Sequence, residues 1–284
     1  MAKATTARSA GLGTLLRKLH KPTYRVPPRE SDENALERLL ALVLQGEDPY
    51  SVARQAVKVL RRSYAHWNEV RVARRFEVRD ALALRRVPQS EERALKAQEF
   101  LRRVFGLQNH LDLDWLYDAT SERREKLLAS LTVAPEHAAP VLDLDAALSE
   151  GADRLPPVST DLKRSLARLS LTPSSPKDGQ VLDLIAPHLK GEKLYPNYLA
   201  LQMHARLICE SKHPRCRQCP VLEGCPHGKR ALGSEGYRVA LEEMSAAARK
   251  AGAGEDSAAR GSGKGGAKGG GKGRARSSSS AQRA

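Results

Sequence analysis

Four cysteines lie between positions 209 and 225, and this feature constrains the chain more than any other. They are Cys209, Cys216, Cys219 and Cys225, and no other cysteine occurs among the 284 residues. Four thiolates this close in sequence can converge on one metal centre, and zinc and an iron–sulfur cluster are the two candidates for soft sulfur ligands. The alternatives are disulfide bonds or thiols with no ligand.

Disulfide bonds would need an oxidising compartment. Residues 1–30 are basic and lack the continuous apolar stretch and small-residue cleavage site of a secretory signal. The chain also contains no run of about eighteen apolar residues, the length that spans a bilayer. We therefore expect a reduced cytoplasmic protein, nucleoid-associated if bacterial, with no membrane contact and with a metal centre at its cysteines.

The cysteine spacing by itself leaves the choice of metal open. Zinc sites usually pair their ligands in two short knuckles. Here only Cys216 and Cys219 form a C-x-x-C pair, and the other gaps are longer.

The net charge of the chain is +15. Residues 251–284 hold seven lysines and arginines against two acidic residues, so most of the excess belongs to residues 1–250. A basic folded body favours a polyanionic partner, most often nucleic acid, although a general solubility bias would give the same composition. Aromatic residues make up only 4% of the chain, so platforms for stacking single-stranded bases are scarce.

Apolar residues recur at helical spacing along most of the chain, without convincing strand alternation. The first stripe follows Ser31, a candidate N-cap, and consists of Leu36, Leu39, Leu40, Val43 and Leu44. Further stripes predict helices after the break at 46–49, after Ser90, and over residues 121–131, 142–148, 160–169, 181–189, 195–209 and 237–249. The pattern predicts an all-α body with these stripes in its core.

The two ends of the chain differ from the body. Residues 1–30 form a basic arm in which three prolines interrupt any long helix. A short amphipathic piece of this arm can dock on the body through Leu12, Leu15, Leu16 and Leu19. Residues 246–284 are rich in Gly, Ser, Lys and Arg without an apolar period, so we expect a disordered tail that contacts phosphates or serves as an inert linker.

The cysteines belong to a longer pattern. Residues 203–209 read MHARLIC and are followed by ESKHPRCRQCPVLEGC. This segment resembles the carboxy-terminal part of the endonuclease III family, in which a helix ends H-G-R-x-x-C and continues as C-x6-C-x2-C-x5-C. Members of that family are helix-hairpin-helix DNA glycosylases with a [4Fe-4S] cluster, and all three cysteine gaps match.

The resemblance implies a [4Fe-4S] cluster rather than zinc at Cys209, Cys216, Cys219 and Cys225. In the family the basic loop after the first cysteine lies near the DNA backbone. The resemblance therefore implies that double-stranded DNA is the partner and that its phosphates are contacted by Lys212, Arg215, Arg217 and Arg206.

A fainter resemblance covers the family's catalytic positions. Residues 158–164, VSTDLKR, resemble V-D-T-H-V-x-R and place Ser159 at the aspartate; residues 131–139, LTVAPEHAA, place His137 nearest the lysine. The family's lyase needs a lysine amine to attack the sugar and a carboxylate to stabilise positive charge. Neither replacement can do this, so we expect Ser159 to be a helix cap and His137 to be a packed or surface residue.

The hairpin between these positions also departs from the family. Val133 and Pro135 stand where two glycines allow backbone N–H groups to approach a phosphate, so binding there should be weakened. Nearby residues that could replace the missing catalytic groups are Asp143, Asp145, Asp161 and Lys163.

We expect an endonuclease III-like two-domain helical fold. Its parts are a basic arm (1–30), a first helix packing with the cluster domain (31–49), a helical barrel with a degenerate hairpin (50–150), an iron–sulfur cluster domain (151–245) and the disordered tail (246–284). The expected function is that of a monomeric [4Fe-4S] DNA-binding protein of the base-excision-repair lineage, a pseudo-enzyme. Two alternatives stay open: an active DNA glycosylase and AP lyase with relocated residues, and an iron–sulfur interaction protein that no longer acts on DNA.

Overall fold

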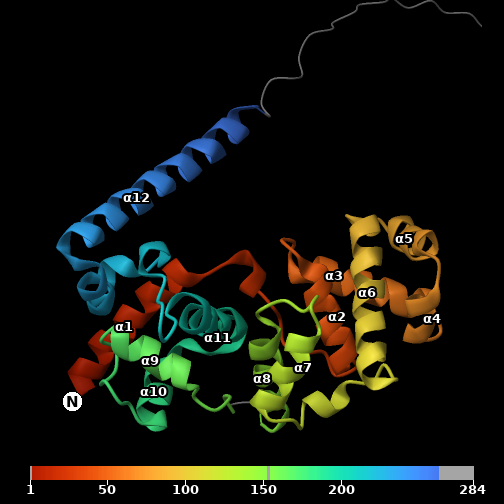
Figure 1. Ribbon diagram of the computed structural model, residues 1–284, viewed down its shortest axis with the longest axis horizontal. Helices are drawn as coiled ribbons and strands as arrows, with labels where there is room; N and C mark the ends of the chain where they lie inside the picture. The colour runs from red at the N-terminus through yellow and green to blue at the C-terminus, as the bar shows by residue number, and fades with distance from the viewer. Residues whose placement is uncertain (1, 152–153, 262–284) are drawn as a thin grey trace, which may run out of the picture.

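The computed structural model describes residues 2–151 and 154–261, and every regular element in this part of the chain is helical (Figure 1). The all-α class predicted from the sequence is therefore confirmed. The α-helices are α1 (Ala2–Leu19), α2 (Ala35–Gln45), α3 (Tyr50–Ser63), α4 (Trp67–Val72), α5 (Arg75–Leu84), α6 (Ser90–Gln108), α7 (Ser121–Ser130), α8 (Ala138–Ser149), α9 (Thr160–Arg168), α10 (Asp178–Ile185), α11 (Leu194–Met203) and α12 (Pro226–Gly261).

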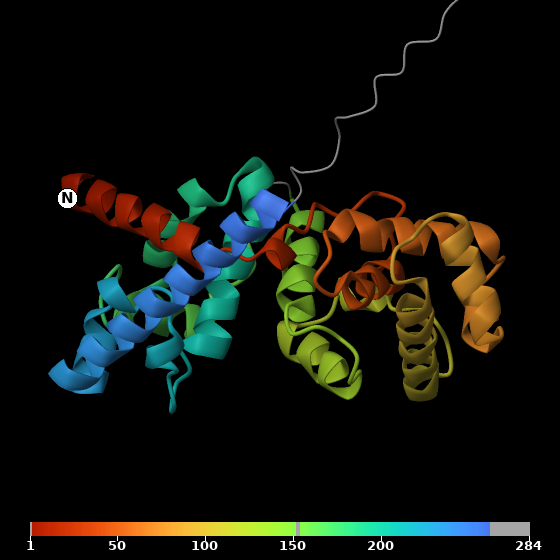
Figure 2. The ribbon, with the colours of Figure 1, turned by 90° about the horizontal axis from the view of Figure 1, so that it is seen from above.

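The helices form two lobes (Figures 1 and 2). The first lobe consists of α2 to α8, and the second consists of α1 and α9 to α12 with the cysteine segment between α11 and α12. The chain passes between the lobes before α2 and again between α8 and α9. Where the lobes meet, α8 packs against α11.

α2 is the central helix of the first lobe. Every residue from Ala35 to Gln45 is buried, and the helix packs against α3 and α6. Its sequence, ALERLLALVLQ, is apolar around most of its circumference, as expected of a helix covered on all sides. Asn34 caps it, rather than the expected Ser31, because the Asn34 side chain accepts a hydrogen bond from Glu37 N at 2.9 Å.

The expected packing of the first helix is wrong. Residues 31–49 were expected to pack with the cluster domain, but α2 is buried in the first lobe because its nearly uniform apolar surface needs neighbours on every side. α1 packs on the second lobe instead, against α10 and α11, and buries Leu12, Leu16 and Leu19. The basic arm is thus mostly one helix, which ends before the prolines.

α12 changes direction at Gly233, where φ is 67°, a conformation that favours glycine. The helix continues to Gly261 and so extends into the stretch expected to begin the disordered tail at residue 246. Residues 262–284 of that expected tail lie outside the described residues. None of the described helices is both long enough and apolar enough to cross a membrane.

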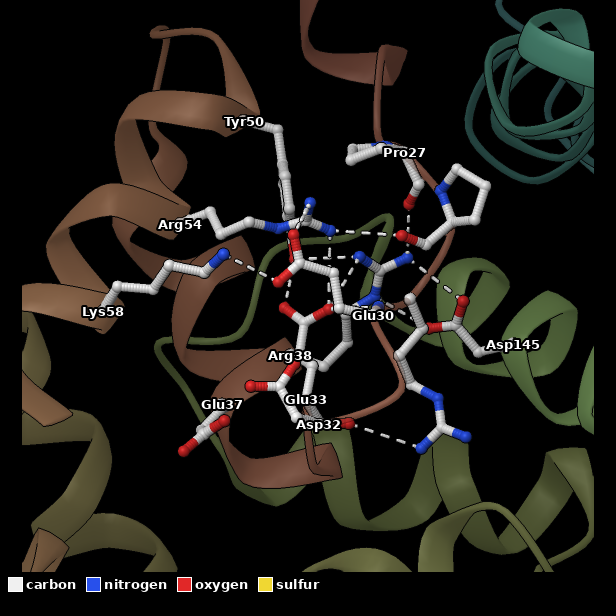
Figure 3. Close-up of polar contacts among 12 residues, drawn as sticks. Pro27, Glu30, Asp32, Glu33, Glu37, Arg38, Tyr50, Arg54, Lys58 and Asp145 are labelled. Atoms are coloured by element: carbon white, nitrogen blue, oxygen red, sulfur yellow. Dashed lines mark hydrogen bonds and ion pairs between the residues drawn. The ribbon is translucent and has the colours of Figure 1, made fainter.

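A buried ion pair lies at the junction of the lobes (Figure 3). The fully buried Arg38 of α2 donates from Nε to Asp145 Oδ2 of α8 at 2.8 Å and from Nη2 to Asp145 Oδ1 at 3.1 Å. Burial lowers the pKa of Arg38, but the attraction of Asp145, Tyr50 and Glu33 together outweighs burial, so the pKa is raised overall. The Arg38 guanidinium is therefore charged in an interior where an unpaired charge is very costly.

Further contacts extend this ion pair to both lobes. Arg38 also donates to Tyr50 Oη of α3 at 2.9 Å and to the Pro27 carbonyl at 2.8 Å. Tyr50 Oη in turn donates to Glu33 at 3.1 Å. The Tyr195 hydroxyl of α11 donates to Asp145 from the second lobe. One buried cluster therefore joins the segment before α2, the first lobe and the second lobe.

Replacing Asp145 with alanine should lower the free energy of unfolding by about 3–5 kcal/mol, because the variant leaves Arg38 buried without its counter-charge. Chemical denaturation followed by circular dichroism measures this loss. As a control, Glu235→Ala removes an exposed partner of Arg238 on α12 and should cost under about 1 kcal/mol. A double variant, Arg38→Met with Asp145→Leu, should be more stable than Asp145→Ala. Equal losses in Asp145→Ala and Glu235→Ala would contradict the importance of the pair.

Candidate metal centre and its basic surroundings

Local turns bring the four cysteines together. α11 continues into a π-helical turn, His204–Ile208, in which Cys209 N bonds the His204 carbonyl at 2.7 Å. Cys216 begins a short 3-10 turn, Cys219 follows that turn directly, and Cys225 immediately precedes α12. The cysteines therefore sit at the ends of turns and helices, where the backbone changes direction.

All four cysteines line one small cavity, together with residues that include His204, Leu222 and Gly228. A Cβ atom at Gly228 would lie 2.6 Å from Leu222 Cδ1, so the close packing at this position excludes a side chain. The Gly228 N–H donates to Cys225 Sγ at 3.4 Å. Among the residues described, no group of three or more His, Cys, Asp or Glu is arranged to hold a metal ion. The four cysteines thus share one cavity, although they are not arranged around a single metal ion.

Burial affects the thiols in this cavity. It raises the pKa of Cys219 to about 12 and also raises the pKa of Cys216 and Cys225. Thiols with raised pKa values stay protonated at neutral pH unless a cationic group binds them as thiolates.

Two arginines of α9 fix the start of the cysteine loop. Arg164 donates to the carbonyls of Cys209 and Ala205 at 3.0–3.1 Å. Arg168 donates to the carbonyls of Glu210 and Ser211 at 2.7 and 3.0 Å, and its Nη1 lies 3.6 Å from Cys209 Sγ. Sequence reasoning missed both residues. Their spacing of four on one helix is a signal for a shared face, but not for what that face contacts.

The predicted phosphate-contacting residues fall into two groups. Lys212, Arg215 and Arg217 are exposed on the loop, although Arg215 also forms an ion pair with Glu210 at 3.1 Å. Arg206 lies in the π-helical turn and pairs with Glu125 of α7 at 2.8 Å. Arg206 therefore connects the two lobes, and the structure does not bring it to the loop surface with the other three.

A basic groove adjoins the cysteine loop. It has a volume of about 550 Å³ and lies between α9, the 174–176 segment and the start of α12. We call it the α9 groove; its cationic lining residues are Lys163, Arg164, Arg168 and Arg230. Because Arg164 and Arg168 also contact the loop, the groove and the cysteine segment form one continuous site.

Ser159 and His137 both have structural surroundings in the fold. Ser159 caps α9 by accepting a hydrogen bond from Leu162 N at 3.2 Å, so its interpretation as a helix cap is confirmed. His137 precedes α8 and is only 8% exposed, and its Nε2 has no hydrogen-bond partner among the described residues. Burial lowers the pKa of His137 to about 4, so the imidazole is neutral at physiological pH.

The hairpin backbone forms hydrogen bonds within itself. The four side chains that could replace the missing catalytic lysine and aspartate form ion pairs. In the hairpin, Ala134 N bonds the Leu131 carbonyl and Ala138 N bonds the Pro135 carbonyl, at 2.8 and 2.9 Å. The four candidate replacements each form an ion pair: Asp143 with Arg124, Asp145 with Arg38, Asp161 with Arg164, and Lys163 with Asp178. No free carboxylate or amine is offered by these four side chains.

Because His137 is buried, we expect the free energy of unfolding to fall in acid. Its pKa is about 4 in the folded chain and ordinarily 6.5, so only the unfolded chain takes up this proton as the pH falls from 6.5 to 4. The free energy of unfolding should fall by about 3 kcal/mol over this range from His137 alone. Denaturation curves at pH 7 and pH 4.5 should show a smaller loss for His137→Leu than for the wild type.

His66→Leu serves as the matched control, because His66 is exposed at the start of α4. The loss of unfolding free energy between pH 7 and pH 4.5 should be the same in His66→Leu as in the wild type. If His137→Leu and His66→Leu lose stability equally on acidification, the buried imidazole is not the cause.

No protein-family model and no curated protein matches this chain. Solved structures do. A trapped endonuclease III–DNA covalent intermediate, an estranged-adenine complex, is 17% identical with a TM-score of 0.34, covering 82% of this chain and 99% of that chain. A thermostable thymine-DNA glycosylase is 14% identical with a TM-score of 0.36, covering 78% and 97%. A non-covalent endonuclease III–DNA complex is 16% identical with a TM-score of 0.34, covering 82% and 98%. These TM-scores are below 0.5, so the likeness carries no conclusion about activity, cofactor or partner.

Proposed function

We propose that this protein binds the backbone of double-stranded DNA through a basic surface that a [4Fe-4S] cluster holds in shape, and that it has no lyase activity. The observation that carries the proposal is the single cavity lined by all four cysteines, next to a groove and a loop rich in cations. The sequence resemblance to the endonuclease III family supports the choice of cluster and partner.

Cys209, Cys216, Cys219 and Cys225 would hold the cluster. When bound, the cluster supplies covalent links among four points of a segment that has little core of its own. The described side chains suit such a group: the donors are four sulfurs, and the Gly228 N–H and the Arg168 guanidinium are directed at two of them. Hydrogen bonds of this kind stabilise negative charge on ligating sulfur.

The surface next to the cluster would contact phosphates. Lys212 and Arg217 are exposed on the loop, and Arg230 lines the α9 groove without an ion pair among the described residues. Cations without carboxylate partners are free to displace counterions from DNA, which drives sequence-independent binding. Such contacts position a duplex but carry no base specificity.

The same structure argues against lyase chemistry. The lyase reaction needs a lysine amine that can form a Schiff base with the sugar. The sequence resemblance assigns the lysine's position to His137, a buried neutral imidazole, and the aspartate's position to Ser159, a helix-capping hydroxyl. Lys163, the amine nearest in sequence to Ser159, is paired with Asp178.

The cluster assignment predicts that freshly purified protein contains about four iron and four sulfide ions per chain and absorbs broadly near about 400 nm. Cys216→Ser should lose this absorption, destabilise residues 203–226 and weaken binding to duplex DNA. Ser211→Ala changes an exposed residue of the same loop and should leave all three properties unchanged. A colourless protein with one bound zinc ion would disprove the assignment.

The catalytic assignment predicts that borohydride traps no covalent adduct between the wild-type protein and duplex DNA that contains an abasic site, because no amine is available. A lysine-dependent abasic lyase serves as the positive control. The double variant His137→Lys with Ser159→Asp should also give no adduct, because residue 137 is buried and the hairpin glycines are absent. Trapping of the wild-type chain would show that another amine performs the reaction.

A further inference from the structure

A second basic groove lies on the first lobe, far in sequence from the cysteines. It has a volume of about 660 Å³, and we call it the α3 groove. It is lined by one side of α3, the segment before α2 and the residue after α5. Its cationic lining residues are Arg25, Arg54, Lys58, Arg62 and Arg85, and no Asp or Glu lines it.

Three of these cations form a row along α3. Arg54, Lys58 and Arg62 are spaced four residues apart and therefore share one face of the helix. Each step of four residues advances about 6 Å along the axis, so the row is about 12 Å long. One strand of duplex DNA carries a phosphate about every 3.4 Å of axis, so the row matches about three or four phosphates. The length suits a chain of phosphates better than a single ion.

The acidic residues near α3 leave the outer part of the groove unneutralised. Arg61, on the neighbouring face, pairs with Asp32 and Glu37 at 3.3 and 3.2 Å. No ion pair among the described residues involves Arg25, Arg62 or Arg85, and all three side chains are exposed. Among the described residues, the groove therefore has one unpaired cation at the Arg62 end of its α3 row, and two more in Arg25 and Arg85.

Arg54 and Lys58, two of the groove's cations, already pair with carboxylates that lie beside the groove, those of Glu30 and Glu33 (Figure 3). The carboxylate of Glu30 accepts from Arg54 Nη1 at 2.9 Å and lies 2.7 Å from Lys58 Nζ. The hydrogen bond from Lys58 lowers the pKa of Glu30. Arg54 and Lys58 are therefore oriented to bind an anionic oxygen, with further cations extending outward from them.

We propose that the α3 groove binds the sugar–phosphate backbone of a nucleic acid strand, as a second DNA contact on the lobe that lacks the cysteines. The lining of the groove also includes Pro27, Pro49 and Val59, apolar surfaces that fit the sugars between phosphates. This inference rests on the proposed function for the identity of the polyanion. A free phosphate ion shares the same chemistry, and the experiment below distinguishes the two sources.

The experiment measures binding of the full-length chain to a fluorescent duplex of about 20 base pairs over a range of salt concentrations. The groove variant is Arg62→Glu with Arg85→Glu. The matched control is Arg102→Glu with Arg103→Glu, two exposed arginines of α6 that line neither groove and change the net charge equally. A loop variant, Lys212→Glu with Arg217→Glu, reports on the cysteine lobe. Circular dichroism checks that all three remain folded.

The groove variant should bind the duplex about tenfold more weakly than the control variant, and its slope of log affinity against log salt should be smaller in magnitude by about two. Equal affinities of the groove and control variants would overturn the inference. If only the loop variant loses affinity, the groove proposal fails and the proposed function stands. If only the groove variant loses affinity, the proposal that the cysteine loop contacts DNA fails instead.

Inorganic phosphate, added at constant ionic strength, separates the two sources of the ligand. For a backbone site, phosphate should compete no better than chloride at the same ionic strength. If phosphate binds the wild type but not the groove variant, while both bind the duplex equally, the groove is a free-phosphate site and the backbone proposal is wrong.

Discussion

The ion pair between Arg38 and Asp145 is the interaction on which the rest of the structure depends. A guanidinium with no exposed surface is tolerable only beside its counter-charge. Because Tyr195 reaches the same carboxylate from α11, the pair also joins the two lobes. The buried polar contacts around Arg38 and Asp145 hold α8 beside α11. They thereby fix the position of the helix that leads into the cysteine segment.

The cysteine segment of the second lobe depends on polar contacts, because few of its side chains are buried. Between residues 209 and 225, the buried side chains are Cys209, Cys219, Val221 and Leu222. Arg164 and Arg168 compensate by binding four backbone carbonyls at the π-helical turn and the start of the loop. Charged donors on carbonyl groups are stronger than neutral ones. The lobe therefore presents a basic surface partly because arginines hold its backbone together.

The sequence predicted features that depend on neighbouring residues, and missed those that depend on distant ones. Apolar periodicity predicted the helical class, and the residue type at Ser159 predicted a cap. Proline positions suggested only a short helix in the arm, yet α1 runs from Ala2 to Leu19 because the prolines come later. The Arg38–Asp145 pair spans 107 positions, and the α3 groove combines three separate segments. No local pattern encodes such pairings; they appear only when the packing is known.

The π-helical turn at His204–Ile208 sets the direction of the first sulfur. A turn of this kind holds one residue more than an α-helical turn, and one residue corresponds to about 100° of rotation around a helix. A related chain that lost one residue here would keep the same intervals between its cysteines, yet aim the first one away from the other three. The cysteine intervals alone are thus insufficient to identify a working cluster site; the length of the preceding turn must match as well.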